Sequence, residues 1–247
     1  MTPLVTGIDP GKAGYSCMIG PTITKGDCTH CGGKGTWLLH SGDMSTGRDV
    51  PCSACGSTGW TGRRIKESTT FWPAPVSGDD YDLVNMSEQC RGWHRSNVSL
   101  VVLELQAPRR HGKGRIGTHE APSSTFTSGF GFGAWKASLT CAGFVERTEE
   151  FLKTGLTGQF FVVVAPDVWK RRLGCTASHS GPDTDYERRK ARDAMSIKVA
   201  QALDPAVDFR PIERSPEARV PSADKACARL IAEYGRACIL GIRRDQK

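Results

Sequence analysis

The sequence predicts an α/β fold in which a mixed sheet is flanked by helices and a small module is inserted into an early hairpin. Strand-like apolar segments come first in the chain, and strands then alternate with helix-like segments, which favours one antiparallel pair followed by parallel strands. Two closely spaced pairs of cysteines interrupt the first strands and indicate the inserted module. At 247 residues the chain can bury a full core.

Three strands are expected before the first helix. They are the apolar stretch that ends at Ile8, residues 15–24 and residues 65–73. An insertion is well tolerated at the tip of such a hairpin because the two ends of the loop are already close. The sequence therefore predicts a main domain of residues 1–24 and 63–247, and an inserted module of residues 25–62.

The rest of the chain alternates between helices and strands. Residues 82–95 are expected to form a helix and residues 99–105 a strand. The glycine-rich residues 128–136 introduce an apolar helix that runs to about Phe144. Three further elements are expected: a very regular strand at 160–164, a helix at 188–203 and a C-terminal helix at 223–236.

Three carboxylates are candidates for one metal site. Asp9 lies where the first strand meets a Pro-Gly turn, Glu104 interrupts the most apolar run of the middle region, and Asp224 opens the C-terminal helix. A carboxylate in a buried strand needs a cation nearby. Two of them also have an ordinary interpretation, since Asp9 can form a turn and the helix dipole favours an acid at the position of Asp224. The three together, in this order, favour a metal-dependent nuclease.

The inserted module carries the cysteines Cys28, Cys31, Cys52 and Cys55. Two C-x-x-C knuckles can supply four thiolates to one tetrahedral ion, and the glycines that follow allow the tight turns. The spacing therefore predicts one structural zinc ion, with disulfides or a redox-active pair as the alternatives. His30 and His40 are expected at the surface because four thiolates already close the site.

Charge and composition agree with a nucleic-acid partner without establishing one. Lysines and arginines number 33 against 26 acidic residues, a formal net charge of +7. No apolar run is long enough to cross a bilayer, so no membrane partner is expected. Four of the ten cysteines are paired at metal spacing and the others are scattered, which favours a reducing, cytoplasmic location.

Two basic segments are candidates for contacts with phosphates. The first is the glycine-rich loop of residues 108–115, directly after the strand with Glu104, and the second lies at residues 170–172. A merely solvated loop is the alternative for the first segment. The candidate DNA-binding residues are Gln106, Arg109, Arg110, Lys113, Arg115, Lys170, Arg171 and Arg172.

Six segments, in this order, resemble one enzyme family: residues 7–11, 103–106, 126–133, 166–174, 192–196 and 230–236. They resemble the RuvC-like Holliday junction resolvases, especially the phage-encoded branch. The inserted module resembles the zinc modules of DnaJ-type proteins, although Ser57 stands in place of a glycine.

The resemblance implies a ribonuclease H-like fold and a homodimer that binds four-way DNA junctions and nicks two strands symmetrically. It implies that Asp9, Glu104 and Asp224 hold two catalytic Mg²⁺ or Mn²⁺ ions, one activating water and the other stabilising the leaving oxygen. If the chain is phage-encoded, the resemblance places it in the cytoplasm of a bacterial host.

One position departs from the family pattern. The family ends with two carboxylates one helical turn apart; Asp224 occupies the first position and Cys227 the second. A thiol is a poor ligand for a hard cation. Either the alignment is shifted, or another acid such as Glu217 substitutes, or metal binding is impaired. A non-cleaving junction binder and a zinc-ribbon adaptor on a ribonuclease H-like scaffold therefore stay open as alternatives.

Overall fold

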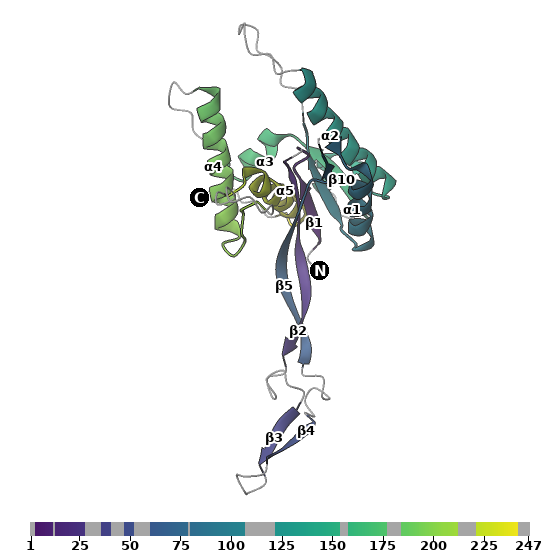
Figure 1. The fold of residues 1–247 in the computed structure, drawn as a ribbon, viewed down its shortest axis with the longest axis vertical. Helices are drawn as coiled ribbons and strands as arrows, with labels where there is room; N and C mark the ends of the chain where they lie inside the picture. The colour runs from purple at the N-terminus through teal and green to yellow at the C-terminus, as the bar shows by residue number, and fades with distance from the viewer. Residues whose placement is uncertain are drawn as a thin grey trace. The chain divides into compact units, whose positions relative to one another are not determined.

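The computed structural model describes residues 3–11, 13–27, 36–40, 47–51, 60–78, 80–106, 122–153, 158–176, 184–211 and 221–241. Contacts divide the chain into two compact units (Figure 1). The first unit, called the main unit below, consists of Met1–Gly20 and Thr69–Lys247, and the second consists of Pro21–Ser68.

A six-stranded mixed sheet organises the fold, with strand order β5-β2-β1-β8-β10-β9. β1 pairs antiparallel with β2 and parallel with β8, and β10 pairs parallel with both β8 and β9. The α/β class and the antiparallel start expected from the sequence are therefore confirmed. The bounds are β1 Val5–Ile8, β2 Tyr15–Asp27, β5 Trp60–Pro73, β8 Leu100–Glu104, β9 Val145–Arg147 and β10 Phe160–Val164.

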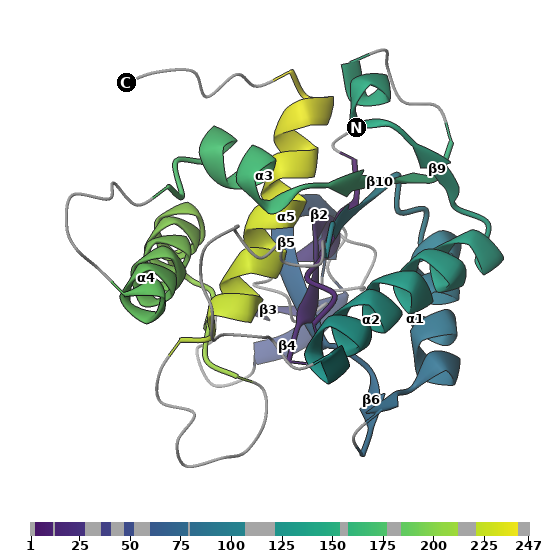
Figure 2. The same cartoon turned by 90° about the horizontal axis from the view of Figure 1, so that it is seen from above.

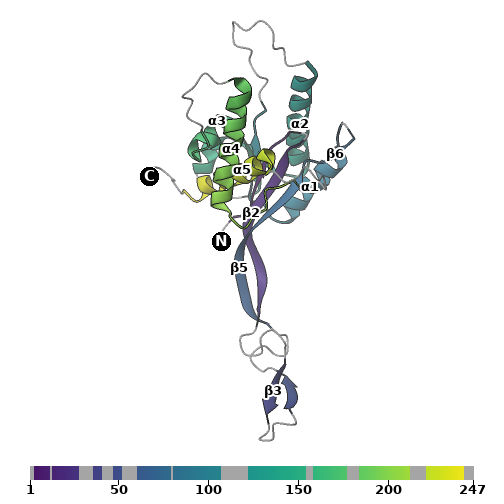
Figure 3. The ribbon, with the colours of Figure 1, turned by 60° about the vertical axis from the view of Figure 1, so that its left-hand side comes forward.

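Helices cover both faces of the sheet in the main unit. α1 and α2 lie together on one face, while α5 lies on the other and packs against α3 and α4 (Figures 2 and 3). The bounds are α1 Leu83–Arg95, α2 Pro122–Cys141, α3 Pro166–Arg172, α4 Asp185–Leu203 and α5 Ala223–Ile239, with a 3-10 helix, η1, at Glu149–Lys153. Two short hairpins complete the described elements: β3 Thr36–His40 with β4 Gly47–Pro51, and β6 Val76–Ser77 with β7 Asp80–Tyr81.

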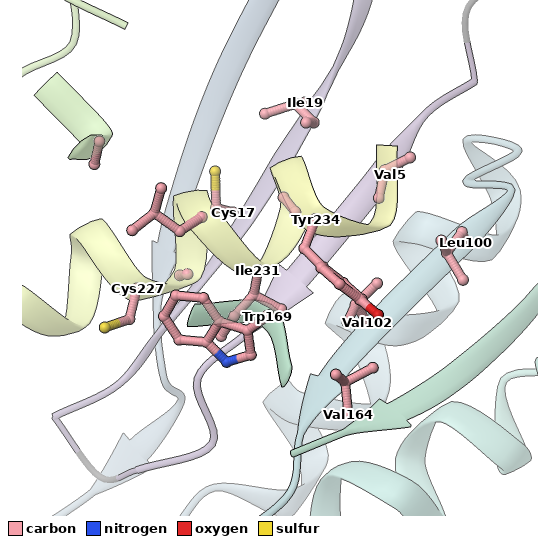
Figure 4. Packing of buried hydrophobic residues seen from close by; sticks show 14 of the residues in the cluster. Val5, Cys17, Ile19, Leu100, Val102, Val164, Trp169, Cys227, Ile231 and Tyr234 are labelled. Carbon is pink, nitrogen blue, oxygen red and sulfur yellow. The ribbon is translucent and has the colours of Figure 1, made fainter. Parts of the chain in front are cut away.

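Alternation along the central strands supplies two apolar cores. In β8, Leu100 and Val102 belong to the core under α5, whereas Val101 and Leu103 belong to the core under α1 and α2. Every residue of this strand is buried, as expected for a central strand covered on both faces. Figure 4 shows the packing of the first core, with side chains of β1, β8 and α5 in contact.

α5 crosses β1 at a very short separation. A Cβ atom built on Gly7 of β1 would lie 2.3 Å from the backbone nitrogen of Ala232, and one built on Gly235 would lie 2.5 Å from Val102 Cγ2. Glycines are therefore required on both sides of this contact. The close packing fixes the start of α5 relative to the end of β1.

The helices begin at polar capping residues. The side chain of Asp82 caps α1, that of Ser222 caps α5, and Thr184 forms a reciprocal capping box with Glu187 at the start of α4. These caps account for the boundaries of α1 and α4, which agree closely with the sequence expectation.

One helix differs from its sequence-based boundaries. α2 begins at Pro122 and ends at Cys141, so the glycine-rich stretch lies inside the helix instead of before it. The helix stops before Phe144 because Gly143 adopts a positive φ of 101°. No helix in the described part of the chain is both long and apolar enough to cross a membrane.

Candidate functional site

Two of the candidate carboxylates lie at the same end of neighbouring parallel strands. Asp9 directly follows β1, and Glu104 is the last residue of β8. The register pairs Ile8 with Leu103, so Asp9 and Glu104 come next on the two strands. The carboxyl ends of parallel strands are where ligands bind in α/β sheets.

The start of α5 brings the third carboxylate to this edge. Asp224 lies in the first turn of α5, and its charge raises the pKa of both Asp9 and Glu104. An effect on both groups requires Asp224 to lie near each of them. Three segments that are far apart in the sequence therefore bring three carboxylates within electrostatic reach of one another.

The carboxyl groups are held in an environment that opposes their ionisation. Burial raises the pKa of Asp9 well above its ordinary value, and the charges of Glu104 and Asp224 raise it further. Burial is also the largest cause of the raised pKa of Glu104. Clustered carboxylates of this kind resist becoming charged together until a cation neutralises them.

A tight turn fixes the backbone of Asp9. The amide of Asp9 donates to the carbonyl of Tyr15 at 3.0 Å, and the amide of Gly14 donates to the carbonyl of Gly11 at 2.9 Å. The amide of Gly11 donates to Asp9 Oδ1 at 3.4 Å, and this bond opposes the rise in the pKa of Asp9. The Pro-Gly turn that marked Asp9 as a candidate in the sequence therefore also holds Asp9 in position.

Glu104 is held by a residue that the sequence did not single out for this role. Trp169 Nε1 donates to Glu104 Oε2 at 2.9 Å, and both residues are buried. Trp169 lies on α3, which begins directly after β10 at the same edge of the sheet. The segment was recognised as a motif, but the sequence gives no sign that its tryptophan contacts a carboxylate 65 positions earlier.

Lys170, expected from the sequence to bind DNA, lies near the carboxylates. Its charge lowers the pKa of both Asp9 and Glu104, and its Nζ lies 5.0 Å from the centre of the Trp169 ring. Its two neighbours are exposed: Arg171 pairs with Asp167 at 3.4 Å, and the guanidinium carbon of Arg172 lies 5.7 Å from the centre of the Tyr234 ring. Lys170 is therefore positioned to act at the carboxylate cluster itself.

Cys227 faces the same cluster, one turn of α5 after Asp224. Its thiol is buried, and burial together with the charges of Asp9 and Glu104 raises its pKa well above the ordinary value. Figure 4 shows Cys227 on α5 and Trp169 on α3 among the packed side chains of this face. Because the charges of both acids act on the Cys227 thiol, Cys227 lies on the face of α5 that its spacing from Asp224 predicted.

The donor set fits a hard divalent cation in three of its four members. Carboxylate oxygens are the ligands that Mg²⁺ and Mn²⁺ prefer, whereas the neutral Cys227 thiol is not. Within the described segments, no three His, Cys, Asp or Glu side chains form a ready-made metal-binding group. Carboxylates that repel one another are expected to close only when a cation is shared between them.

Several residues named in the sequence analysis lie outside the described part of the chain. They are Cys28, Cys31, Cys52 and Cys55, Arg109, Arg110, Lys113 and Arg115, and Glu217. The zinc site and the basic loop therefore remain predictions. Gln106 is described, and it lies partly buried two residues after Glu104.

Comparison with known proteins gives structural similarity without sequence relatives. No family model and no curated protein sequence matches the chain. Among solved structures, RuvC of Thermus thermophilus aligns with a TM-score of 0.39 at 12% identity, and the same protein in complex with a Holliday junction substrate with 0.42 at 12%; each alignment covers 96% of both chains. The Fowlpox virus resolvase in complex with Holliday junction DNA gives a TM-score of 0.30 at 11% identity, covering 94% of this chain and 96% of that one. At these identities and TM-scores, only the side chains of this chain can support a function.

Proposed function

We propose that the protein is a metal-dependent endonuclease with a ribonuclease H-like main unit that cuts four-way DNA junctions. The observation that carries the proposal is the convergence of Asp9, Glu104 and Asp224 at the carboxyl ends of β1 and β8. Three mutually repelling acids cost stability, so their clustering needs a functional reason. A bound divalent cation supplies that reason.

Each residue has a distinct task in the proposed reaction. Asp9, Glu104 and Asp224 would hold two Mg²⁺ or Mn²⁺ ions, which supply an activated water and stabilise the leaving 3′ oxygen in phosphodiester hydrolysis. Trp169 orients Glu104 through its hydrogen bond, and the turn at residues 9–14 orients Asp9. Lys170 places a positive charge beside the acids, where it can attract the scissile phosphate.

The remaining parts of the proposal concern binding. Gln106, Arg171 and Arg172 would contact DNA near the site, and Arg109, Arg110, Lys113 and Arg115 would hold phosphates, so affinity should fall steeply with salt. A homodimer would place two such sites on one junction for symmetric nicking. Cys28, Cys31, Cys52 and Cys55 would hold one structural zinc ion in the second unit.

The test is Asp9→Asn, assayed for nicking of a mobile four-way junction in Mg²⁺ beside a linear duplex. Removing the carboxylate should abolish nicking and leave junction binding intact or tighter, because a negative charge that faces phosphate is lost. Asp167→Asn is the matched control, since it changes an exposed aspartate whose pair with Arg171 is worth little. Full nicking by the Asp9 variant would refute the assignment.

The position of Cys227 favours a second candidate, a protein that binds junctions and cuts them poorly or not at all. The thiol lies where a fourth oxygen ligand would complete the cluster. Nicking in Mg²⁺ at an established junction affinity separates the two candidates, because a non-cleaving binder shows the affinity alone.

A further inference from the structure

Tyr81 lies next to the turn that carries Asp9, and no sequence motif pointed to it. It is the last residue of β7, 72 positions after Asp9, and it is only 7% exposed. Its hydroxyl donates a hydrogen bond to the carbonyl oxygen of Pro10 at 3.0 Å. Pro10 is itself buried and follows Asp9 directly, so this bond satisfies a buried carbonyl in the turn.

α2 holds the tyrosine ring in place. A Cβ atom built on Gly131 would lie 2.3 Å from the hydroxyl oxygen of Tyr81 and 2.4 Å from its Cζ. The glycine therefore allows the phenol to lie directly against the helix backbone. The ring of Phe130 lies 6.0 Å from the Tyr81 ring, at an interplanar angle of 48°, and supports it from the neighbouring position.

The turn is thus held at two points by residues outside it. The amide of Ala74 donates to the carbonyl of Gly14 at 2.8 Å at the far end of the turn, and Tyr81 holds Pro10 at the near end. The contact to Pro10 bears directly on the Asp9 side chain, because the Pro10 carbonyl belongs to the same peptide as the Gly11 amide, which donates to Asp9 Oδ1 at 3.4 Å. Metal ligands must be held to within about half an ångström to be effective.

We infer that Tyr81 is a positioning residue for the metal ligand Asp9, and that Gly131 leaves the room that the phenol needs to reach Pro10. The inference rests on the proposed function, because it concerns how well Asp9 is placed to bind a cation. The competing interpretation is that Tyr81 only fills the core under α1 and α2. The two differ in what happens when the hydroxyl alone is removed.

The experiment measures Mn²⁺ binding to the full-length protein by electron paramagnetic resonance, together with the Mg²⁺ dependence of nicking. Tyr81→Phe keeps the ring, so the core should stay packed and the protein should still unfold cooperatively, with a modestly lower Tm because the buried Pro10 carbonyl loses its donor. We expect Mn²⁺ affinity to fall about two- to tenfold, the effect of one ordinary hydrogen bond. Nicking should need correspondingly more Mg²⁺, and junction binding without metal should not change.

Gly131→Ala provides a second route to the same displacement, because its methyl group must push the phenol away from Pro10. Gly133→Ala is its matched control on the same helix, since a Cβ at Gly133 meets no atom within 4 Å. We expect the first variant to weaken Mn²⁺ binding at least as much as Tyr81→Phe does. The second should bind Mn²⁺ as the parent does.

Hydrogen exchange at residues 9–14 tests the role of Tyr81 without any metal. Exchange should be faster in Tyr81→Phe and Gly131→Ala than in the parent and in Gly133→Ala. Parental exchange and parental Mn²⁺ affinity in both variants would overturn the inference and leave the proposed function standing. Mn²⁺ binding that Asp9→Asn does not reduce would instead overturn the proposed function, and exchange at the turn would still decide the role of Tyr81.

Discussion

Asp9 illustrates how a functional residue can oppose the stability of its own fold. Burial and the charges of Glu104 and Asp224 oppose ionisation of its carboxyl group, whereas the Gly11 amide and the charge of Lys170 favour ionisation. A protein selected for stability alone would replace one of the acids. In the absence of a bound cation, the cluster therefore stores unfavourable electrostatic energy.

The raised pKa of Asp9 predicts how the stability of the protein changes with pH. Because the pKa of Asp9 is raised on folding, the folded protein keeps a proton at pH values where the unfolded chain has lost it, so the free energy of unfolding decreases as the pH rises above the ordinary aspartate range. Asp9→Asn removes this loss. Without added Mg²⁺, the variant should have a higher Tm than the parent at pH 7.5, and the difference should shrink at pH 4. A Tm below that of the parent by the same amount at both pH values would contradict the argument.

The second residue-scale prediction concerns Cys227. The thiol faces the acids at a point that suits a hard oxygen donor, so the parent should nick slowly in Mg²⁺ and faster in Mn²⁺, which tolerates softer ligands. Cys227→Asp should raise the Mg²⁺ rate by about two orders of magnitude or more, because even the outer partners of a metal site are worth about 10- to 100-fold. Cys227→Ala should stay slow. A parent that is already fast in Mg²⁺ and is slowed by Cys227→Asp would show that the remaining ligand lies elsewhere.

The sequence reveals the acidic residues of this site better than the residues that hold them in position. Asp9 and Glu104 are visible because each carboxylate interrupts a local pattern, a turn or an apolar run. Trp169 and Tyr81 satisfy their local patterns completely, and only tertiary contacts over 65 and 71 positions give them their partners. No periodicity or spacing rule encodes such long-range hydrogen bonds.

At the scale of elements, the contact between β1 and α5 determines where Asp224 and Cys227 lie. The backbone of α5 approaches Gly7 so closely that no side chain fits between them. The sequence locates both elements through their apolar patterns but does not indicate this separation. It also placed α2 too late, because glycines are read as helix breakers, whereas Gly131 lies inside the helix to make room for Tyr81.

The element-scale prediction tests this packing with Gly7→Ala. The new methyl would lie 2.3 Å from the Ala232 nitrogen and 2.5 Å from the Ala228 oxygen, both backbone atoms that can move only if α5 moves. We expect the free energy of unfolding to fall by about 3 kcal/mol or more in urea titrations. Gly92→Ala, on α1 with no atom within 4 Å of the new methyl, should instead gain about 0.5–1 kcal/mol. Equal stability of the two variants would show that α5 is not held against β1 in this way.

At the scale of the whole molecule, the chain consists of two units whose boundaries fall inside strands. The second unit, Pro21–Ser68, begins within β2 and ends within β5, so the hairpin strands belong partly to each unit. The sequence placed the inserted module at residues 25–62 from the cysteine spacing and from the two strand-like segments that flank it. The full length of the strand could not be read there, because Lys25, Gly26 and Asp27 do not continue the strand-like pattern although the strand runs to Asp27.

We predict that a metal ion organises the second unit, and that loss of this metal affects only that unit. A unit of this size is too small to depend on an apolar core alone, and four thiolates at knuckle spacing can close one tetrahedral site. Elemental analysis should find about one zinc per chain, the count for a closed four-thiolate site.

The double variant Cys28→Ser, Cys52→Ser should lose the zinc. The main unit should keep its melting transition and its nicking activity, because the two units have separate internal contacts. Cys141→Ser, which changes an exposed free cysteine of α2, should keep the zinc and is the matched control. Stoichiometric zinc retained by the double variant would place the ion elsewhere in the chain, and a collapse of the main unit on zinc loss would show that the two units fold as one.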